Sequence, residues 1–171
     1  MKLTKRSAIA VAAVGSMAAA AAIAVPSGSA QTPGATTLSF YEPDSQSVFK
    51  FVDNPPKGIG RGPGPKSRFS IGDQVAISSP LYDKKGGTRQ GKLYAQGTIV
   101  TGGDFRKAAL QVTGTYVLTD GSQIAVAGVL LFSKDSTFSV VGGTGRYEGA
   151  RGHIVAHSDD TSSTDTLTLL P

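Results

Sequence analysis

The sequence contains no cysteine, and this absence removes several classes of site at once. A chain without thiols has no disulfide, no thiol nucleophile and no thiolate metal site. Its stability must come from an apolar core or from oligomerisation, and the roughly 140 residues beyond a candidate leader can build such a core. Histidine is also scarce, since His153 and His157 are the only two. On one strand they would lie about 13 Å apart, too far to share a metal ion, so we expect no metal site.

A strong charge of either sign is lacking as well. The formal net charge is +5, but Lys2, Lys5 and Arg6 precede an apolar run from Ala8 to Val25. Without these three residues, 14 Lys and Arg stand against 12 Asp and Glu, a net charge of +2. This balance lacks the electrostatic footprint of a nucleic-acid-binding protein, so we expect no nucleic-acid partner. The basic segment from Lys57 to Arg68 is rich in Gly and Pro and has no aromatic residue, which is typical of a solvated loop.

The first thirty residues match the pattern of a secretory signal peptide. A basic start and an apolar run are followed by the small-residue stretch "PSGSA" that ends at Ala30. A membrane anchor is the alternative, but the run is mostly alanine, contains Gly15 and Ser16, and is close to the shortest length that spans a bilayer. We therefore expect a signal peptide at 1–30, a secreted domain at 31–171, and no stable membrane insertion after cleavage.

Helical periodicity is missing from the rest of the chain, where polar and apolar residues alternate with a period of two. This alternation predicts an all-β domain of eight or nine strands. Antiparallel strands of this length favour closure into a barrel, because closure removes exposed edges, and a flat sandwich is the alternative. The predicted strands lie at 37–42, 47–52, 69–78, 91–101, 107–118, 122–132, 136–141, 152–157 and 164–170.

A cluster of four glycines, Gly142, Gly143, Gly145 and Gly149, follows an apolar strand-like run. A dinucleotide-binding fingerprint needs G-x-G-x-x-G between a strand and a helix. Here Glu148 occupies the third glycine position, and the segment that follows is strand-like, so no helix N-terminus is available for a phosphate. We interpret the glycines as a tight corner between two strands, where left-handed backbone conformations are needed.

The same corner resembles a known family. The segment "VVGGTGRYEGARG" (Val140 to Gly152) is similar to a corner found in the barrels of allene oxide cyclases and plant dirigent proteins. Weaker matches are "SIGDQVAISSPLYD" (Ser70 to Asp83), "AQG" (Ala95 to Gly97) and "SFYEPD" (Ser39 to Asp44). The resemblance covers nearly all of the predicted domain. It implies a closed eight-stranded antiparallel β-barrel, usually a homotrimer, with an apolar cavity and no cofactor.

The resemblance is compatible with three functions, and it does not decide between them. The cyclases fold an unstable epoxide and steer its ring closure, which implies an isomerase acting on a lipid- or polyketide-like substrate by positioning and exclusion of water. The dirigent proteins orient phenoxy radicals, which implies a protein directing stereoselective radical coupling. The third function is that of a non-catalytic carrier of a small apolar ligand.

Glu42 is the leading candidate for a catalytic residue, because alternation places it on the same strand face as Leu38 and Phe40. Burial would raise the pKa of its carboxyl and would let it polarise an epoxide or exchange a proton. The resemblance places Arg151 on the arginine of the dirigent "ARG" motif, where it would bind a carboxylate or phenolate. The alternatives are a surface carboxylate for Glu42 and a structural clamp on neighbouring carbonyls for Arg151.

The cavity wall has five further candidates. By resemblance, Asp44 and Ser79 correspond to two asparagines that help hold a water in the cyclases, and both depart from the cyclase residue. For Asp44, a turn-forming role is the alternative. The other three candidates are aromatic: Phe40, Tyr94 and Tyr116.

The predicted strand from Phe69 to Ser78 contains a carboxylate, Asp73, on the same face as Ile71 and Val75. A buried carboxylate needs hydrogen-bond donors around it, so we expect Asp73 to be structural. The long loop from Asp53 to Arg68 follows the second predicted strand, and its composition does not decide between a lid over the cavity and a disordered connection.

Overall fold

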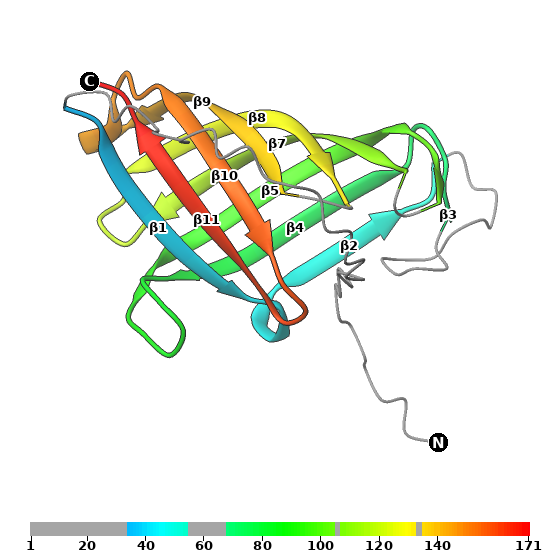
Figure 1. Ribbon diagram of the computed structural model, residues 1–171, viewed down its shortest axis with the longest axis horizontal. Coiled ribbons are helices and arrows are strands. Elements are labelled where there is room, and N and C mark those ends of the chain that lie inside the picture. Colours follow the sequence, from blue (N-terminus) through cyan, green and yellow to red (C-terminus); the bar gives the residue numbers. More distant parts are fainter. Residues whose placement is uncertain (1–33, 55–67, 105–106, 133–134) are drawn as a thin grey trace, which may run out of the picture.

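The computed structural model describes residues 34–54, 68–104, 107–132 and 135–171, which form an all-β barrel (Figure 1). The ring closes where Tyr82 of the last strand pairs with Tyr41 of the first. The closed, eight-stranded antiparallel barrel that the sequence predicted is therefore confirmed, and the flat sandwich is excluded. Its strands follow one another in the order β1 (Thr36–Pro43), β11 (Ser162–Leu169), β10 (Gly152–Ser158), β9 (Ser136–Thr144), β8 (Gln123–Leu131), β7 (Ala109–Leu118), β5 (Arg89–Thr101) and β4 (Gln74–Tyr82).

Along one edge, β4 pairs first with β2 (Val48–Val52) and then with β1. After β1, the 3-10 turn η1 (Asp44–Gln46) leads into β2, which pairs with the first half of β4. The backbone of β1 pairs with only the last residue of β4, so β1 and β2 together cover this edge. The remaining elements are a small sheet of β3 (Arg68–Phe69) and β6 (Gly103–Asp104), and a second 3-10 turn, η2 (Gly145–Tyr147).

Two sequence predictions fall on segments of the chain that the structure does not describe. The signal peptide at 1–30 lies outside the described residues, and so does most of the loop from Asp53 to Arg68, namely residues 55–67. Both stay predictions. Within the described residues, no helix has the length and apolarity that crossing a membrane requires.

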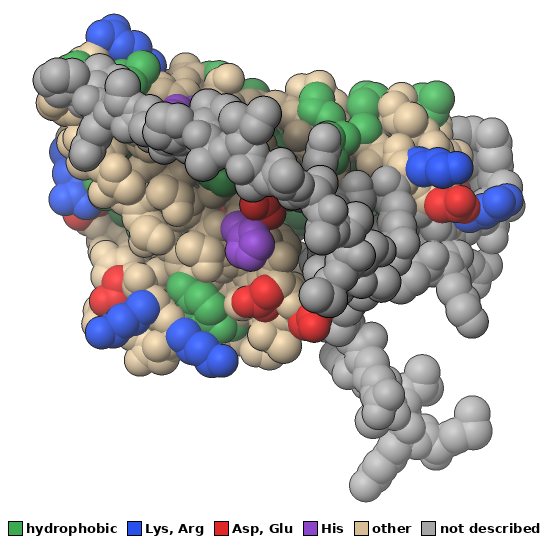
Figure 2. Space-filling view, in the orientation of Figure 1, with side chains coloured by type: hydrophobic (Ala, Val, Ile, Leu, Met, Phe, Trp, Pro, Cys, Tyr) green, Lys and Arg blue, Asp and Glu red, His purple; other side chains and the backbone are tan. Residues whose placement is uncertain are grey.

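The alternation of side chains decides what fills the barrel. In β11, Asp165, Leu167 and Leu169 are buried, whereas the threonines between them are partly exposed. Figure 2 shows the outer face of β1, β11 and β10, where hydrophobic and charged side chains are scattered among tan atoms of the backbone and of other side chains. Burial of a large aliphatic side chain contributes about 1.5–3 kcal/mol. The interior contains six such side chains with at most a trace of exposed surface: Leu81, Ile99, Leu110, Ile124, Ile154 and Leu167.

The single strand predicted from Phe69 to Ser78 is interrupted, and that prediction is wrong. Asp73 lies in a turn between β3 and β4, where its carboxylate accepts the backbone N–H groups of Ser70 (2.7 Å) and Asn54 (3.0 Å). Burial alone would raise the pKa of Asp73, but these donors and the Ser70 hydroxyl outweigh it and lower the pKa. The turn also exposes Ile71, which is 68% accessible instead of in the core.

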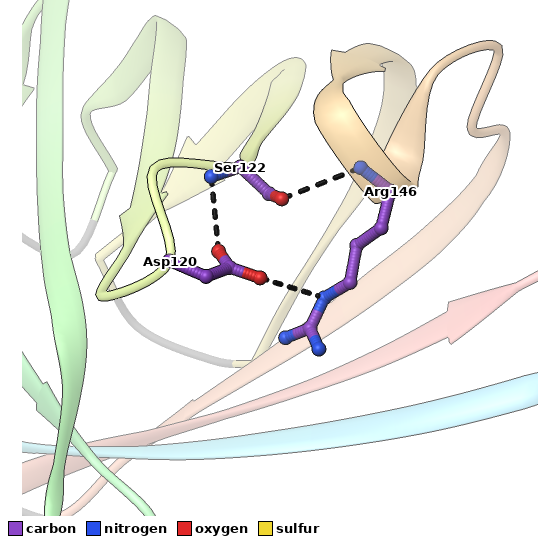
Figure 3. Close-up of polar contacts among 3 residues, drawn as sticks. All are labelled: Asp120, Ser122 and Arg146. Atoms are coloured by element: carbon purple, nitrogen blue, oxygen red, sulfur yellow. Dashed lines mark hydrogen bonds and ion pairs between the residues drawn. The ribbon is translucent and has the colours of Figure 1, made fainter.

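The glycine corner, residues 142–149, joins β9 to β10 through η2, as expected for a corner between two strands. Gly145 has a φ of +64°, and a Cβ there would lie 2.7 Å from the Ser122 hydroxyl oxygen. That oxygen accepts the backbone N–H of Arg146 at 3.3 Å. Asp120 accepts the Ser122 N–H at 2.9 Å and pairs with Arg146 at 3.1 Å (Figure 3). The corner is thus fastened to the β7–β8 hairpin.

Candidate functional site

Two carboxyl groups meet inside the barrel, one from each of two neighbouring strands. Glu42 of β1 is 6% exposed and Asp165 of β11 is 4% exposed. In the strand register Glu42 faces Ser163 and Phe40 faces Asp165, so the two acidic residues are diagonal neighbours on the inner face. Long side chains reach each other across such a diagonal. The two carboxyl groups are hydrogen-bonded to one another.

A phenol from a strand elsewhere in the ring completes this acidic group. The hydroxyl of Tyr116, on β7, donates to Oδ2 of Asp165. The Tyr116 ring stacks on Phe40, with centroids 5.7 Å apart and planes inclined by 25°. Both rings are buried. The interior position expected for Phe40 and Tyr116 is therefore the one they occupy, and their rings form an apolar wall beside the carboxyl pair.

Burial and neighbouring hydrogen-bond partners determine which of the two carboxyl groups, Glu42 or Asp165, is protonated. Burial raises the pKa of Glu42 well above its usual range, the neighbouring Asp165 carboxylate raises it further, and the Ser79 hydroxyl opposes this by donating to Glu42. Burial also raises the pKa of Asp165, but hydrogen bonds from Glu42 and Tyr116 stabilise its charge. Because Tyr116 donates to Asp165, the charge of the pair is favoured on Asp165 and the proton on Glu42. This arrangement can give a proton at one oxygen and take one at another.

Two more predicted residues lie beside the pair. Ser79 of β4 is 1% exposed, and its hydroxyl oxygen lies 2.6 Å from that of Ser47. Asp44, in η1, has one carboxylate oxygen that is buried without a hydrogen-bond partner among the described residues. Partial burial raises the pKa of Asp44, and the charge of Asp159 adds to this. The structure therefore brings Asp44, Ser79, Phe40 and Tyr116 to Glu42.

Tyr94 does not belong to this group, and the prediction that it lines the interior is wrong. β5 turns Leu93 and Ala95 toward the core, so the side chain between them points outward. Tyr94 is 50% exposed, and the ammonium group of Lys92 lies 4.9 Å from the centre of its ring.

Arg151 is also separated from Glu42. It is exposed, and its guanidinium donates to the carbonyl of Pro171. The adjacent Gly152 pairs with Leu169, whereas Glu42 pairs with Ser163. These positions on β11 are about 20 Å apart at the usual rise of a strand. The observed contact matches the structural clamp, and we do not assign Arg151 to the site.

Asp165 is the residue that sequence reasoning missed. The segment "TDTLTLL" places Asp165 in alternation with Leu167 and Leu169, which is the same signal that identified Glu42. Within the residues that the structure describes, no three His, Cys, Asp or Glu side chains are grouped so as to hold a metal ion.

The outer surface of the barrel has a shallow apolar groove of about 620 Å³. Val48 is 48% exposed there and Val141 is 61% exposed, while Tyr94 forms part of the same wall. Apolar side chains from β2, β4, β5, β8 and β9 thus share one exposed face. The apolar cavity expected in the interior stays a prediction.

Comparison with known proteins agrees with the fold. A family model described as "Dirigent-like protein" matches residues 35–170. No curated protein has significant similarity to the sequence. Among solved structures, the pterocarpan synthase dirigent protein PsPTS1 has a TM-score of 0.59 and 21% identity, over 81% of this chain and 95% of that one.

Two other similar barrels have different activities. A pyocyanin demethylase has a TM-score of 0.58 at 18% identity, over 80% of this chain and 99% of that one. A nonspecific heme-binding cyclase, which catalyses a [4 + 2] cycloaddition during neoabyssomicin biosynthesis, has a TM-score of 0.53 at 15% identity. That match covers 79% of this chain and 66% of the other. At these identities the likeness establishes the fold alone.

Proposed function

Because the chain belongs to the dirigent-like protein family, we propose that the interior of its barrel binds a small apolar molecule and guides an intramolecular ring closure or isomerisation of it. The observation that supports this proposal most is the buried pair of Glu42 and Asp165, with Tyr116 hydrogen-bonded to it. A core built for stability alone would have apolar residues here, since buried carboxyl groups cost free energy.

The roles of the two carboxyl groups follow from their protonation. The Glu42 O–H bond breaks as its proton passes to a carbonyl, ether or epoxide oxygen of the substrate, which helps a ring bond to form or break. The resulting Glu42 carboxylate, or Asp165, then accepts a proton from the rearranged substrate. The substrate and product have the same atoms, so the reaction consumes no co-reactant. The Phe40 and Tyr116 rings exclude water and hold the apolar part of the substrate.

The electrostatics of the site favour one class of substrate. The buried residues of the described chain include no lysine, arginine or histidine, while three acidic groups meet at Asp165. An anionic group would be repelled by the Asp165 carboxylate. We therefore propose a substrate that presents a neutral oxygen acceptor to Glu42. Cyclisation is also the activity of one of the similar structures, the [4 + 2] cyclase.

The assembly and location of the protein belong to the same proposal. We infer that the protein is secreted, through the leader at 1–30, and that it forms a homotrimer. The exposed apolar face around Val141 and Tyr94 is the surface we assign to contact between copies, because a monomer would leave it in water.

The test begins with the ligand. Native mass spectrometry of the protein purified from its own culture medium, followed by solvent extraction, identifies what the barrel binds. Turnover of that compound, or of its precursor, is then compared between wild type, Glu42→Gln and Glu148→Gln. Glu148 is the only other glutamate and is exposed, so it is the matched control.

We expect Glu42→Gln to reduce turnover by about 100-fold or more, the usual contribution of a general acid, with ligand binding retained. Glu148→Gln should behave as wild type. Full turnover by Glu42→Gln on a confirmed substrate would exclude Glu42 as the acid. Binding without turnover in the wild type would instead identify a carrier.

A further inference from the structure

Two serine hydroxyls connect the buried carboxyl pair to the edge of the barrel. The Ser79 hydroxyl is hydrogen-bonded to Glu42 and also to Ser47, with 2.6 Å between the two serine oxygens. Ser47 is partly exposed, whereas Ser79 and Glu42 are buried. Tyr116 is hydrogen-bonded to Asp165 at one end of this group, and Ser79 is hydrogen-bonded to Ser47, which meets solvent, at the other. Glu42 lies between them and interacts with both Asp165 and Ser79.

The fold places Ser47 over Ser79 because the first strand of the ring is interrupted. β1 ends at Pro43, η1 follows, and β2 begins at Val48, which pairs with Ser78. On this edge of β4, Ser78 pairs with Val48 of β2 and Tyr82 pairs with Tyr41 of β1. Residues 79–81, which lie between them, have no backbone partner on this edge among the described residues. Ser47 lies at this interruption, and the two residues before it are exposed.

The donors and acceptors of this chain of hydroxyls suit proton transfer. Ser47 has two acceptors within reach of its hydroxyl, the Ser79 oxygen at 2.6 Å and the Pro43 carbonyl at 3.0 Å. Ser79 has Glu42 on one side and Ser47 on the other. When both hydroxyls point inward, each O–H donates toward the Glu42 carboxylate. When Ser47 turns outward, the Pro43 carbonyl stabilises that orientation.

We propose that Ser47 and Ser79 form a hydroxyl relay that carries protons between Glu42 and solvent. In the inward direction, hydronium gives a proton to the Ser47 oxygen, the Ser47 proton passes to the Ser79 oxygen, and the Ser79 proton passes to the Glu42 carboxylate. Each serine gains one O–H bond and loses one, and water is left outside. The relay rests on the proposed function, because it lets a buried acid recover its proton when the substrate does not return it.

Other charged groups around Glu42 do not offer this connection. Asp165 and Tyr116 face it from β11 and β7, and both are buried. Asp44 acts on Glu42 from η1 through its charge. Among the described groups that meet Glu42, Ser79 is therefore the one that continues to a partly exposed hydroxyl.

Proton exchange at Glu42 tests the relay without any substrate. The sequence has only two glutamates, so protein labelled with ¹³C at the glutamate carboxyl carbon gives two carboxyl signals, and Glu42→Gln assigns them. Glu148 is the internal reference. At the pH where Glu42 is half ionised, the line shape and relaxation dispersion of its signal give the rate at which the acid and carboxylate forms interconvert.

We expect Ser47→Ala and Ser79→Ala each to slow this exchange by about tenfold or more, the kinetic equivalent of one lost hydrogen bond. Ser78→Ala removes a neighbouring hydroxyl that faces the outer groove, and it should exchange as wild type. Ser47→Thr keeps the hydroxyl and should restore the rate. Among the described residues the Ser47 hydroxyl bonds to Ser79 and to the Pro43 carbonyl and not to Glu42, so a merely structural role for Ser79 predicts no effect of Ser47→Ala.

Wild-type exchange in Ser47→Ala would overturn the relay, and this variant decides the test even if Ser79→Ala fails to fold. The result is independent of the proposed function. Slow exchange in Ser47→Ala, together with full turnover in Glu42→Gln, would establish the proton path and exclude the catalytic role. Wild-type exchange in Ser47→Ala, with turnover lost in Glu42→Gln, would leave the acid in place and exclude the path.

Discussion

Glu42 of β1 and Asp165 of β11 hydrogen-bond to each other inside the barrel, and the buried residues of the described chain include no basic side chain to neutralise them. A carboxyl pair without a basic partner is costly to bury, because the Asp165 charge loses its hydration and a second charge on Glu42 would be repelled by it. The fold therefore retains an arrangement that works against its own stability. Such an arrangement is typical of sites selected for chemistry.

Replacement of Glu42 by Gln should stabilise the protein as the pH rises. Because the pKa of Glu42 is raised in the folded state, its contribution is fully present below the usual glutamate pKa and is lost as the pH rises toward the folded value. Gln keeps the donor to Asp165 without titrating. Over that window the variant should gain about 1.4 kcal/mol per pH unit relative to wild type. Urea unfolding from pH 5 to 9 measures this gain.

Glu148→Gln is the control for this titration, since it removes an exposed glutamate and should leave the difference from wild type near zero. A stability difference between Glu42→Gln and wild type that stays constant from pH 5 to 9, or that shifts in favour of wild type as the pH rises, would contradict the raised pKa. The second outcome would show that the ionised Glu42 is stabilised by its surroundings.

Asp73→Asn should destabilise the protein, and the loss should depend on pH in the opposite sense. The pKa of Asp73 is lowered in the folded state, so its contribution is present above the usual aspartate pKa and disappears as the pH falls through the folded value. Asn offers one acceptor oxygen where the backbone N–H groups of Ser70 and Asn54 use two. We expect a loss of about 2–3 kcal/mol at pH 7, measured by urea unfolding.

The exposed Asp104, which pairs with Arg68 at the surface, provides the comparison for Asp73. Asp104→Asn should change stability little, because solvent screens such pairs. Equal losses for both variants at pH 7 would show that the turn around Asp73 does not depend on its buried hydrogen bonds.

Gly145 can be required for its positive φ angle or for the lack of space for a Cβ beside Ser122, and Gly145→Ala compared with Gly121→Ala separates these two requirements. Gly145 and Gly121 both have positive φ angles, +64° and +83°, but only at Gly145 would a Cβ meet a close neighbour, the Ser122 hydroxyl. Gly121→Ala should therefore cost about 1–2 kcal/mol from the backbone alone. Gly145→Ala should cost about 1–3 kcal/mol more, because it also forces Ser122 aside. Thermal unfolding of both variants gives the difference, and equal losses would mean that Ser122 moves freely.

The homotrimer that we propose should depend on the face that contains the outer groove. Val141→Asp introduces a charge where the wild type exposes 61% of an apolar side chain. Light scattering coupled to size-exclusion chromatography should report a trimer for the wild type and a monomer for this variant, because burying an unpaired charge is unfavourable. Val155→Asp, on β10, is the matched control and should remain a trimer. A wild-type monomer would remove the basis for the trimer.

The sequence predicted the barrel well because alternation and the glycine corner both act locally. It predicted Glu42 by the same alternation, and that signal was equally present for Asp165. The sequence does not reveal the register between β1 and β11. That register places Phe40 opposite Asp165 and so brings Glu42 next to Asp165. Register across distant strands depends on the whole ring.

The errors have similar physical causes. The chemistry of Tyr94 favours a place in the cavity wall, but Leu93 and Ala95 already occupy the inner face of its strand. The turn at Asp73 interrupts a sequence with strand-like alternation, because backbone donors from Ser70 and Asn54 converge on one carboxylate. Such convergence arises only in the folded chain and produces no recognisable pattern of polar and apolar residues in the sequence.

The ring is held shut at one seam by very few backbone pairs. β1 pairs with β4 through the backbone only at Tyr41 and Tyr82, and the Tyr82 hydroxyl adds a 2.7 Å bond to Gln46 of η1. Every other junction of the ring is a ladder of several pairs. Local fluctuation at this seam can separate β1 from β4 without unfolding the other strands. Amide hydrogens there should exchange with solvent before those of the other junctions.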